Sequence, residues 1–307
     1  MGVRYQLSYD EFQDQWNWSV GRGFASESLS RNGVQAKTMI WVDRAAGSTT
    51  DSTTPTNSLN AGVIYAVNSD NQLLWYQHTG WQDGSRSWAA SGEAQQVGNG
   101  WNFKHLFSGG DGVIYAVTVD GDLLWYKHTG FQNGSRSWAV GGEAQKIGNG
   151  WGNFKHLFSG GNGVIYAVTS DNRLLWYKHT GWQDGSASWA TREAQQIGNG
   201  WNFRQLFSGG DGVIYAVTSD NRLLWYRHTG WQDGSASWAV RGEAQQIGNG
   251  WNFRQLFSGG DGVIYAVNSD NQLLWYKHTG WQDGSASWAA SGAAQQIGNG
   301  WNFRQLF

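Results

Sequence analysis

One unit of about 50 residues occurs five times in this chain of 307 residues. The string Leu-Leu-Trp-Tyr begins at residues 73, 123, 174, 223 and 273, so successive copies lie 50, 51, 49 and 50 residues apart. Gly152 is the one extra residue, and a residue missing before Glu193 offsets it. A fixed period of this length is typical of repeat folds, in which each unit packs against its neighbours.

Each unit contains four candidate strands separated by turns rich in Gly, Asp and Asn. In the last complete unit we expect strands over residues 253–257 (FRQLF), 263–267 (VIYAV), 273–278 (LLWYKH) and 293–297 (AAQQI), with a turn over residues 258–262 (SGGDG). Runs of β-branched and aromatic residues bounded by such turns favour strands. Four strands per unit predict an all-β fold, a five-bladed β-propeller of four-stranded antiparallel blades.

The last copy of the FRQLF strand, residues 303–307, stands at the end of the chain. The first unit begins at its second strand, so it lacks a first strand of its own. We therefore expect the C-terminal strand to complete the first blade. This pairing would close the ring and leave no exposed sheet edge between the ends.

Residues 1–60 do not share the repeat. Residues 3–8 and 36–43 alternate well enough to be strands, so residues 1–44 are expected to form a small N-terminal β extension. Residues 45–60 are rich in Ser and Thr, contain Pro55, and are expected to be a linker, followed by the propeller at 61–307. The extension either packs on the propeller or serves as a docking arm, which makes residues 1–60 a candidate for homo-oligomerisation.

Composition argues against several classes of partner. The net charge is −2 and only 14% of residues are charged, which gives no attraction to nucleic acid or anionic membranes. The chain has no Cys, and no run approaches the ~18 apolar residues that a membrane insertion needs. The first 14 residues lack the apolar segment of a secretory signal. The sequence thus leaves the localisation unknown, with the cytoplasm and release by a non-classical route both open.

The titratable residues do not form a catalytic set. All seven His fall in two repeating slots, whereas catalysis usually needs one asymmetric group of residues. We expect His78 and its equivalents to be structural, and Asp111, Asp211 and Asp261 to set turn geometry through side-chain hydrogen bonds. Residues 119–122 (VDGD) are similar to part of a calcium loop but lack the remaining ligands. The expectation is a protein that is not an enzyme, with no cofactor and no metal.

The best candidate site is the polar loop before the fourth strand together with the turn after it. In four units the loop reads Trp-Gln-Asp-Gly-Ser-x-Ser-Trp, and the turn adds Asn-Gly-Trp. Indole faces can pack on the C–H face of a pyranose ring, while Asp and Asn can bond its hydroxyl groups. Trp88 and its equivalents are either part of this site or core residues between blades. The candidate residues are Trp81, Asp83, Trp88, Asn99, Trp101, Phe131, Asn133, Trp138, Asn149, Trp151, Trp182, Asp184, Trp189, Asn199, Trp201, Trp231, Asp233, Trp238, Asn249, Trp251, Trp281, Asp283, Trp288, Asn299 and Trp301.

The repeat Ser-x-Ser-Trp-Ala…Ala-Gln-x-Ile-Gly-Asn-Gly-Trp-x-Phe-Arg/Lys-x-Leu-Phe…Gly-x-Ile-Tyr-Ala-Val resembles that of the tachylectin-2-like lectins. The resemblance covers residues 61–307 in all five units. It implies a five-bladed propeller with one sugar site per blade for N-acetylglucosamine or N-acetylgalactosamine. The family repeat has Asp-Asn before the blade Trp, where this chain has Arg-Ser or Ala-Ser.

The function predicted from these features is multivalent binding of glycans that carry N-acetylhexosamines. The alternative is a non-enzymatic scaffold or protein-interaction propeller, natural or engineered, for which near-identical units would serve equally well. Phe131 and Asn133 replace Trp and Asp in the second unit, so the sequence predicts a weaker site there.

Overall fold

The computed structural model describes residues 4–10, 15–21, 30–31, 34–35 and 62–307, which divide between two compact units, Met1–Pro55 and Thr56–Phe307. In the first unit β1 (Arg4–Asp10) pairs with β2 (Gln15–Gly21), and β3 (Ser30–Arg31) pairs with β4 (Val34–Gln35), both antiparallel. The first strand predicted in this region thus overlaps β1. The expected strand over 36–43 and the linker over 45–60 lie outside the described residues, and homo-oligomerisation through 1–60 stays a prediction.

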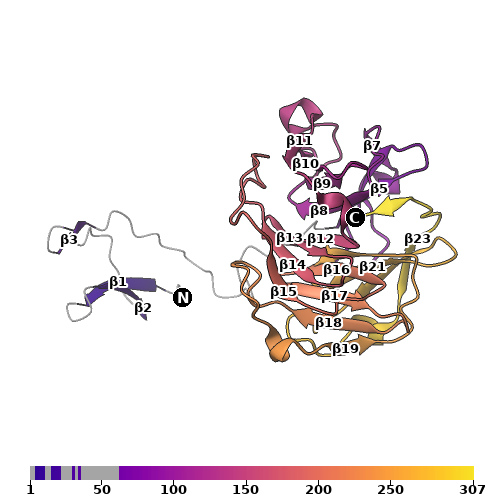
Figure 1. Ribbon diagram of the computed structural model, residues 1–307. Coiled ribbons are helices and arrows are strands. Elements are labelled where there is room, and N and C mark those ends of the chain that lie inside the picture. The colour runs from indigo at the N-terminus through magenta and orange to yellow at the C-terminus, as the bar shows by residue number, and fades with distance from the viewer. Residues whose placement is uncertain (1–3, 11–14, 22–29, 32–33, 36–61) are drawn as a thin grey trace. The chain divides into compact units, whose positions relative to one another are not determined.

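The described part of Thr56–Phe307 is a five-bladed β-propeller, and each blade is a four-stranded antiparallel sheet (Figure 1). Blades 1 to 5 are numbered in chain order, and each is given from its first to its fourth strand. They are β24 (Gln305–Leu306), β5 (Val63–Val67), β6 (Leu73–Gln77) and β7 (Gln95–Gly98); β8 (His105–Gly110), β9 (Val113–Val117), β10 (Leu123–Lys127) and β11 (Gln145–Gly148); β12 (His156–Gly161), β13 (Val164–Val168), β14 (Leu174–Lys178) and β15 (Gln195–Gly198); β16 (Gln205–Gly210), β17 (Val213–Val217), β18 (Leu223–Arg227) and β19 (Gln245–Gly248); β20 (Gln255–Gly260), β21 (Val263–Val267), β22 (Leu273–Lys277) and β23 (Gln295–Gly298). The predicted fold class is therefore confirmed.

The first hairpin of blades 2 to 5 is tighter than the sequence indicated. In blade 5, β20 continues through Ser258 to Gly260, with a bulge in its register, and residues 261 and 262 alone form the turn. Asp261 and Gly262 both have positive φ, 48° and 79°, which is the geometry of a two-residue hairpin turn. Asp261 therefore sets the turn through its backbone conformation. The side-chain hydrogen bond comes from Ser258, whose Oγ accepts the Gly260 N–H at 3.0 Å.

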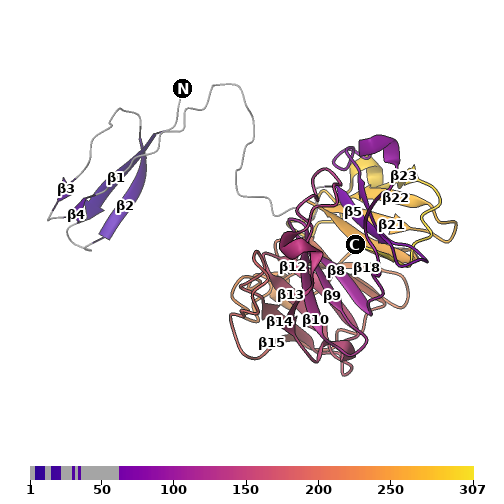
Figure 2. The ribbon, with the colours of Figure 1, turned by 90° about the horizontal axis from the view of Figure 1, so that it is seen from above.

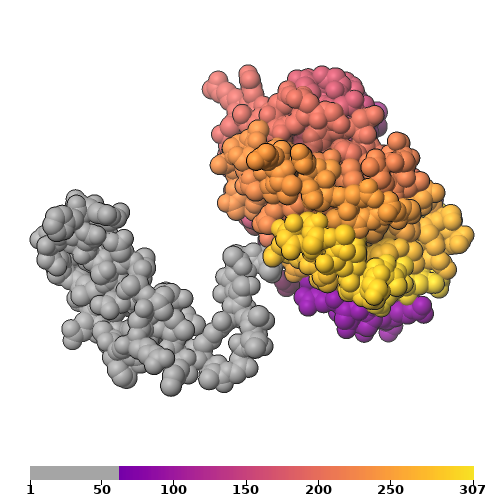
Figure 3. Space-filling view, turned by 90° about the horizontal axis from the view of Figure 1, so that it is seen from below, coloured from indigo at the N-terminus to yellow at the C-terminus, as the bar shows by residue number. Residues whose placement is uncertain are grey.

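The C-terminal strand closes the ring, as predicted. Gln305 pairs with Val67 and Leu306 with Ala66, and Tyr65 and Phe307 exchange backbone hydrogen bonds of 2.9 and 3.1 Å. Figures 2 and 3 show the end of the chain (yellow) beside the first strands of the propeller (purple). This pairing supplies blade 1 with the strand that its own unit lacks, so the sheet edge is covered.

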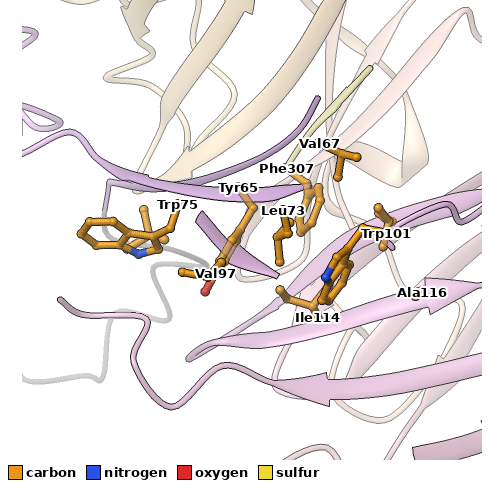
Figure 4. Packing of buried hydrophobic residues seen from close by; sticks show 11 residues of the cluster. Tyr65, Val67, Leu73, Trp75, Val97, Trp101, Ile114, Ala116 and Phe307 are labelled. Atoms are coloured by element: carbon orange, nitrogen blue, oxygen red, sulfur yellow. The ribbon is translucent and has the colours of Figure 1, made fainter. Parts of the chain in front are cut away.

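Neighbouring blades share their hydrophobic core. The second strand of every blade is buried along its whole length, because both faces of its sheet are covered by other blades. Figure 4 shows one such cluster, in which Tyr65 of blade 1 lies between Trp75 and Phe307, with Ile114 of blade 2 close by. The stability of one blade therefore depends on the blade beside it.

A buried Tyr–His pair joins each blade to the next. The hydroxyl of Tyr65 in blade 1 lies 2.8 Å from Nδ1 of His128 in blade 2, and His128 Nε2 lies 2.7 Å from the Ser135 carbonyl. A carbonyl only accepts, so Nε2 donates, and the Nδ1 of a neutral ring accepts from the tyrosine hydroxyl. The same pair recurs at all five interfaces. His78 and its equivalents are thus structural, as expected.

Removing one of these hydroxyl groups tests their contribution to stability. Tyr115→Phe leaves the buried Nδ1 of His179 without its donor. The free energy of unfolding in urea should fall by about 1–3 kcal/mol, the cost of an unsatisfied buried polar atom. Tyr126→Phe is the matched control, because its half-buried hydroxyl has no hydrogen-bond partner in the described part of the chain. A loss of equal size in both variants would contradict the role of the pair.

The same histidines make stability depend on pH. Burial lowers the pKa of His78, His128, His179, His228 and His278 below the ordinary value. Because the folded pKa is the lower one, their contribution is complete above about pH 6.5 and declines as pH falls below it. Urea unfolding between pH 7.5 and 5.5 should show a falling midpoint. A midpoint that is constant or rises over this range would refute the neutral-ring arrangement.

Candidate functional site

The predicted loop is held in place by its own Asp and by the buried His. Asp83 Oδ1 accepts the Ser85 N–H at 2.9 Å, and this bond lowers the pKa of the Asp83 carboxyl. His78 Nε2 donates to the Ser85 carbonyl at 2.7 Å from below. Asn133 makes the same bond to Ser135 at 3.0 Å, so the second unit keeps the loop geometry despite its substitution. One side-chain oxygen of Asp83 and one of Asn133 thus accept a hydrogen bond within the turn.

Trp88 and its equivalents lie between blades but are only half-buried. Trp138 is half-buried and donates its indole N–H to the Val97 carbonyl of the preceding blade at 3.0 Å. Its ring centroid lies 4.7 Å from that of His128 and 5.6 Å from that of Trp101. The indole therefore packs between two blades and still leaves part of its face exposed.

Trp101 and its equivalents are core residues that form the floor beneath this face. Trp101 is 5% exposed and packs against Tyr126 of the next blade at 4.9 Å. Gly98 makes room for it, since a Cβ at that position would lie 2.2 Å from Trp101 Nε1. Within residues 62–307 no hydrogen bond is made by Trp101 Nε1. The indole N–H is thus a donor beside the cavity described next.

A cavity of about 260 Å³ lies between blades 1 and 2, and one of about 240 Å³ lies at the same place between blades 3 and 4. Both are lined by an Asn-Gly-Trp turn from one blade and by a Trp and a Tyr from the next. The lining residues are Val97, Gly98, Asn99, Gly100, Trp101, Phe103, Tyr126, Trp138 and Gly142 in the first, and Ile197, Gly198, Asn199, Gly200, Trp201, Phe203, Tyr226, Trp238 and Gly242 in the second. We call these the inter-blade pockets.

The grouping of residues by sequence unit was therefore wrong. Trp88 and Trp101 belong to one unit but lie in different interfaces, because Trp88 packs against Trp301 and Trp101 packs against Trp138. Each pocket is lined by the Asn-Gly-Trp turn of one unit and by the half-buried Trp of the following unit. The tyrosine of the Leu-Leu-Trp-Tyr string, such as Tyr126, also lines the pocket and was missed, although its half-polar ring and regular spacing could have indicated it.

The Trp81-type and Asp83-type residues do not line the inter-blade pockets. Trp231 and Asp283 line a separate cavity of about 260 Å³ between blades 4 and 5. Arg227 crosses this cavity and donates to the Gln282 carbonyl at 2.6 Å. The structure thus divides the predicted site into two places, of which only the inter-blade pocket contains the Asn-Gly-Trp turn.

A strained turn forms part of the rim of both inter-blade pockets. In η2 (Ala139–Gly142), Val140, Gly141 and Gly142 have successive φ values of 51°, 65° and 87°. The same left-handed turn occurs in η1 (Ala89–Gly92), η4 (Ala239–Gly242) and η5 (Ala289–Gly292). Gly142 and Gly242 line their pockets. Left-handed backbone at residues other than glycine costs energy and concentrates at functional sites.

The described residues hold no group of three or more His, Asp or Glu that could bind a metal ion. Asp122, in the segment similar to a calcium loop, forms an ion pair with Lys146 at 2.8 Å. None of the described helices is long and apolar enough to cross a membrane. No charged side chain lines either inter-blade pocket, so these pockets suit a neutral ligand with both apolar and hydrogen-bonding faces.

Comparisons with known proteins relate the chain to propellers. The family model described as Tachylectin matches residues 59–192. A solved structure described under "The de novo evolutionary emergence of a symmetrical protein is shaped by folding constraints" is 27% identical, with a TM-score of 0.52, over 80% of this chain and 97% of that one. The six-bladed fucose-recognising lectin of Aleuria aurantia is 16% identical, with a TM-score of 0.40, over 77% and 74% of the two chains. No curated protein matches the sequence.

The strained rim can be tested by substitution. Val140→Gly should raise the free energy of unfolding by about 1 kcal/mol, because a β-branched residue in the left-handed region costs more than the added backbone entropy of Gly. Val119→Gly is the control, since Val119 is an exposed valine, 78% accessible, without positive φ. Urea unfolding should show a gain for the first variant only, and a loss for Val140→Gly would contradict the strain.

Proposed function

Because this chain is a tachylectin-like five-bladed propeller, we propose that it is a lectin that binds glycans bearing N-acetylhexosamines, with one site at each interface between blades. The observation that carries the proposal is the inter-blade pocket, with its aromatic walls, its Asn and its lack of charge. An aromatic surface with a few convergent polar groups is the general form of a sugar-sized site.

The pocket offers contacts for both faces of an amino sugar. The exposed part of Trp138 supplies a flat apolar surface for the C–H face of a pyranose ring. Gln96 donates its side-chain N–H to Asn99 Oδ1. This bond orients the Asn99 amide and leaves the side-chain N–H groups of Asn99 as donors. Gln196 orients Asn199 in the same way at 2.6 Å. The indole N–H of Trp101 adds a further donor, so an acetamido carbonyl or a ring hydroxyl would find partners here.

Repetition of the pocket would make weak sites useful. A shallow sugar site with a Kd of about 1 mM contributes only about −4 kcal/mol. Several sites that engage a dense glycan surface together gain roughly 10²–10⁴ in avidity. Near-identical blades thus favour multivalent binding over catalysis, which needs a residue set that one blade has and the others lack.

Titration with N-acetylglucosamine tests the proposal. Replacing Asn99, Asn149, Asn199, Asn249 and Asn299 with Ala together should weaken binding about fivefold at each site, because each site loses a hydrogen bond between neutral groups worth about 1 kcal/mol. These side chains are exposed, so the fold should persist. Calorimetry and agglutination inhibited by free N-acetylhexosamine are the measurements.

The chain provides its own control for this experiment. Glu93, Glu143, Glu193 and Glu243 stand where the fifth unit has Ala293, so their joint replacement by Ala should leave sugar binding unchanged. A folded wild-type protein that binds no amino sugar would refute the proposed specificity for N-acetylhexosamines. Binding to no glycan at all would favour the alternative, a scaffold or protein-interaction propeller.

A further inference from the structure

The interface between blades 2 and 3 is built differently from the other four. The two one-residue slips of the repeat, the inserted Gly152 and the residue missing before Glu193, are about 40 positions apart in the sequence. In the fold they meet, because the turn after β11 and the loop before β15 face each other across this interface, where Trp151 packs on Trp189. Both slips therefore fall at one interface, at the place equivalent to the inter-blade pockets.

The insertion reshapes one wall of this pocket. Residues Trp151–Asn153 form the short helix η3, and Gly152 packs so closely that a Cβ on it would lie 3.2 Å from Gly121 Cα. The other units have Asn71, Asn172, Asn221 and Asn271 at the place of Gly121, and their side chains would obstruct this contact. The insertion and the change to Gly121 are thus coupled.

A hydrogen bond that holds the turn at three of the five interfaces is absent at this one. His156, Gln205 and Gln255 each donate to the backbone carbonyl of the Phe in the next turn, at 3.0, 2.8 and 2.9 Å. The corresponding partner of His105 would be Phe154, which follows Gly152. His105 Nε2 is instead buried without a partner among the described residues, and Gln305, the fifth equivalent, also makes no such bond there.

The Asn of this pocket is not oriented as in the others. Gln96, Gln196, Gln246 and Gln296 each donate to the Asn three residues later. The second unit has Lys146 at this position, and Lys146 pairs with Asp122 at 2.8 Å. In the described part of the chain, Asn149 consequently has no side-chain hydrogen bond, and its exposed amide can rotate.

The residue missing before Glu193 removes the left-handed turn on the other side of this interface. Blade 3 is the one blade without the left-handed turn, since no residue from 190 to 193 has a positive φ. The indole planes of Trp151 and Trp189 are 26° apart, against 33° or 34° at the other four interfaces. By contrast, Phe131 leaves the backbone contact of its loop intact, since its carbonyl accepts the Trp75 indole N–H at 2.7 Å, as Trp81 accepts that of Trp275.

We propose that the pocket between blades 2 and 3 is the one unequal site, binding N-acetylglucosamine about tenfold more weakly than the other four. This rests on the proposed lectin function. The weakening follows because Asn149 must be ordered on binding and because the rim glycine equivalent to Gly142 is absent. A tenfold difference in Kd corresponds to about 1.4 kcal/mol, which is within the range of one lost hydrogen bond.

An NMR titration with N-acetylglucosamine can measure each site separately. The indole N–H signals of Trp88, Trp138, Trp189, Trp238 and Trp288 each report one interface. We expect four signals to saturate together and that of Trp189 to need about ten times more sugar. Equal dissociation constants at all five, or a weak site at Trp138 alone, would overturn this inference while leaving the lectin function intact.

Two sets of variants sharpen the result. Asn149→Ala should leave the four strong sites and their stoichiometry unchanged, whereas the matched Asn249→Ala should reduce four strong sites to three. A repaired protein would have Gly152 deleted, Gly121→Asn, Lys146→Gln and a glycine inserted after Arg192. Its Trp189 signal should saturate at the same sugar concentration as the other four. A folded repaired protein whose Trp189 site stays weak would count against the inference. No shift at any indole would overturn the lectin function itself, and this inference with it.

Discussion

Five buried hydrogen bonds between a tyrosine hydroxyl and a histidine ring join each blade to the next around the whole ring. Each histidine also donates to the carbonyl of a loop serine in its own blade, as His128 does to Ser135. One neutral ring thus connects the centre of one sheet with the polar loop of the next. Because burial lowers the histidine pKa, the ring stays neutral at pH 7 and keeps both bonds.

The inter-blade pockets depend on this arrangement. The loop that the histidine holds leads into Trp138, whose indole N–H reaches back to the preceding blade. The position of the exposed indole is therefore determined by two blades at once. The Asn-Gly-Trp turn opposite it comes from the preceding unit, and no single unit contains a complete pocket. A change in one unit consequently alters a site that it shares with its neighbour.

This sharing explains why near-identical units produce unequal sites. Gly152 and the deletion before Glu193 both lie outside the strands, so the strands of blades 3 to 5 keep their pairing. The change is concentrated at one interface, where Lys146 replaces the glutamine that orients the equivalents of Asn149 and the left-handed turn is absent. Phe131 and Asn133, which differ more visibly in the sequence, keep the hydrogen bonds of their equivalents.

The sequence alone determined the number of blades, the four strands of each and the closure through residues 303–307, because these follow from a period and from short-range strand and turn preferences. It also identified the Asn and Trp residues of the pocket. The hairpin boundaries were missed because Ser258 to Gly260 can extend a strand only when Asp261 accepts a left-handed conformation. Only the tertiary structure decided which residues meet. Adjacent units face each other across an interface, so Trp101 lies with Trp138 and not with Trp88. A pattern read along one unit cannot show contacts that the ring makes between two.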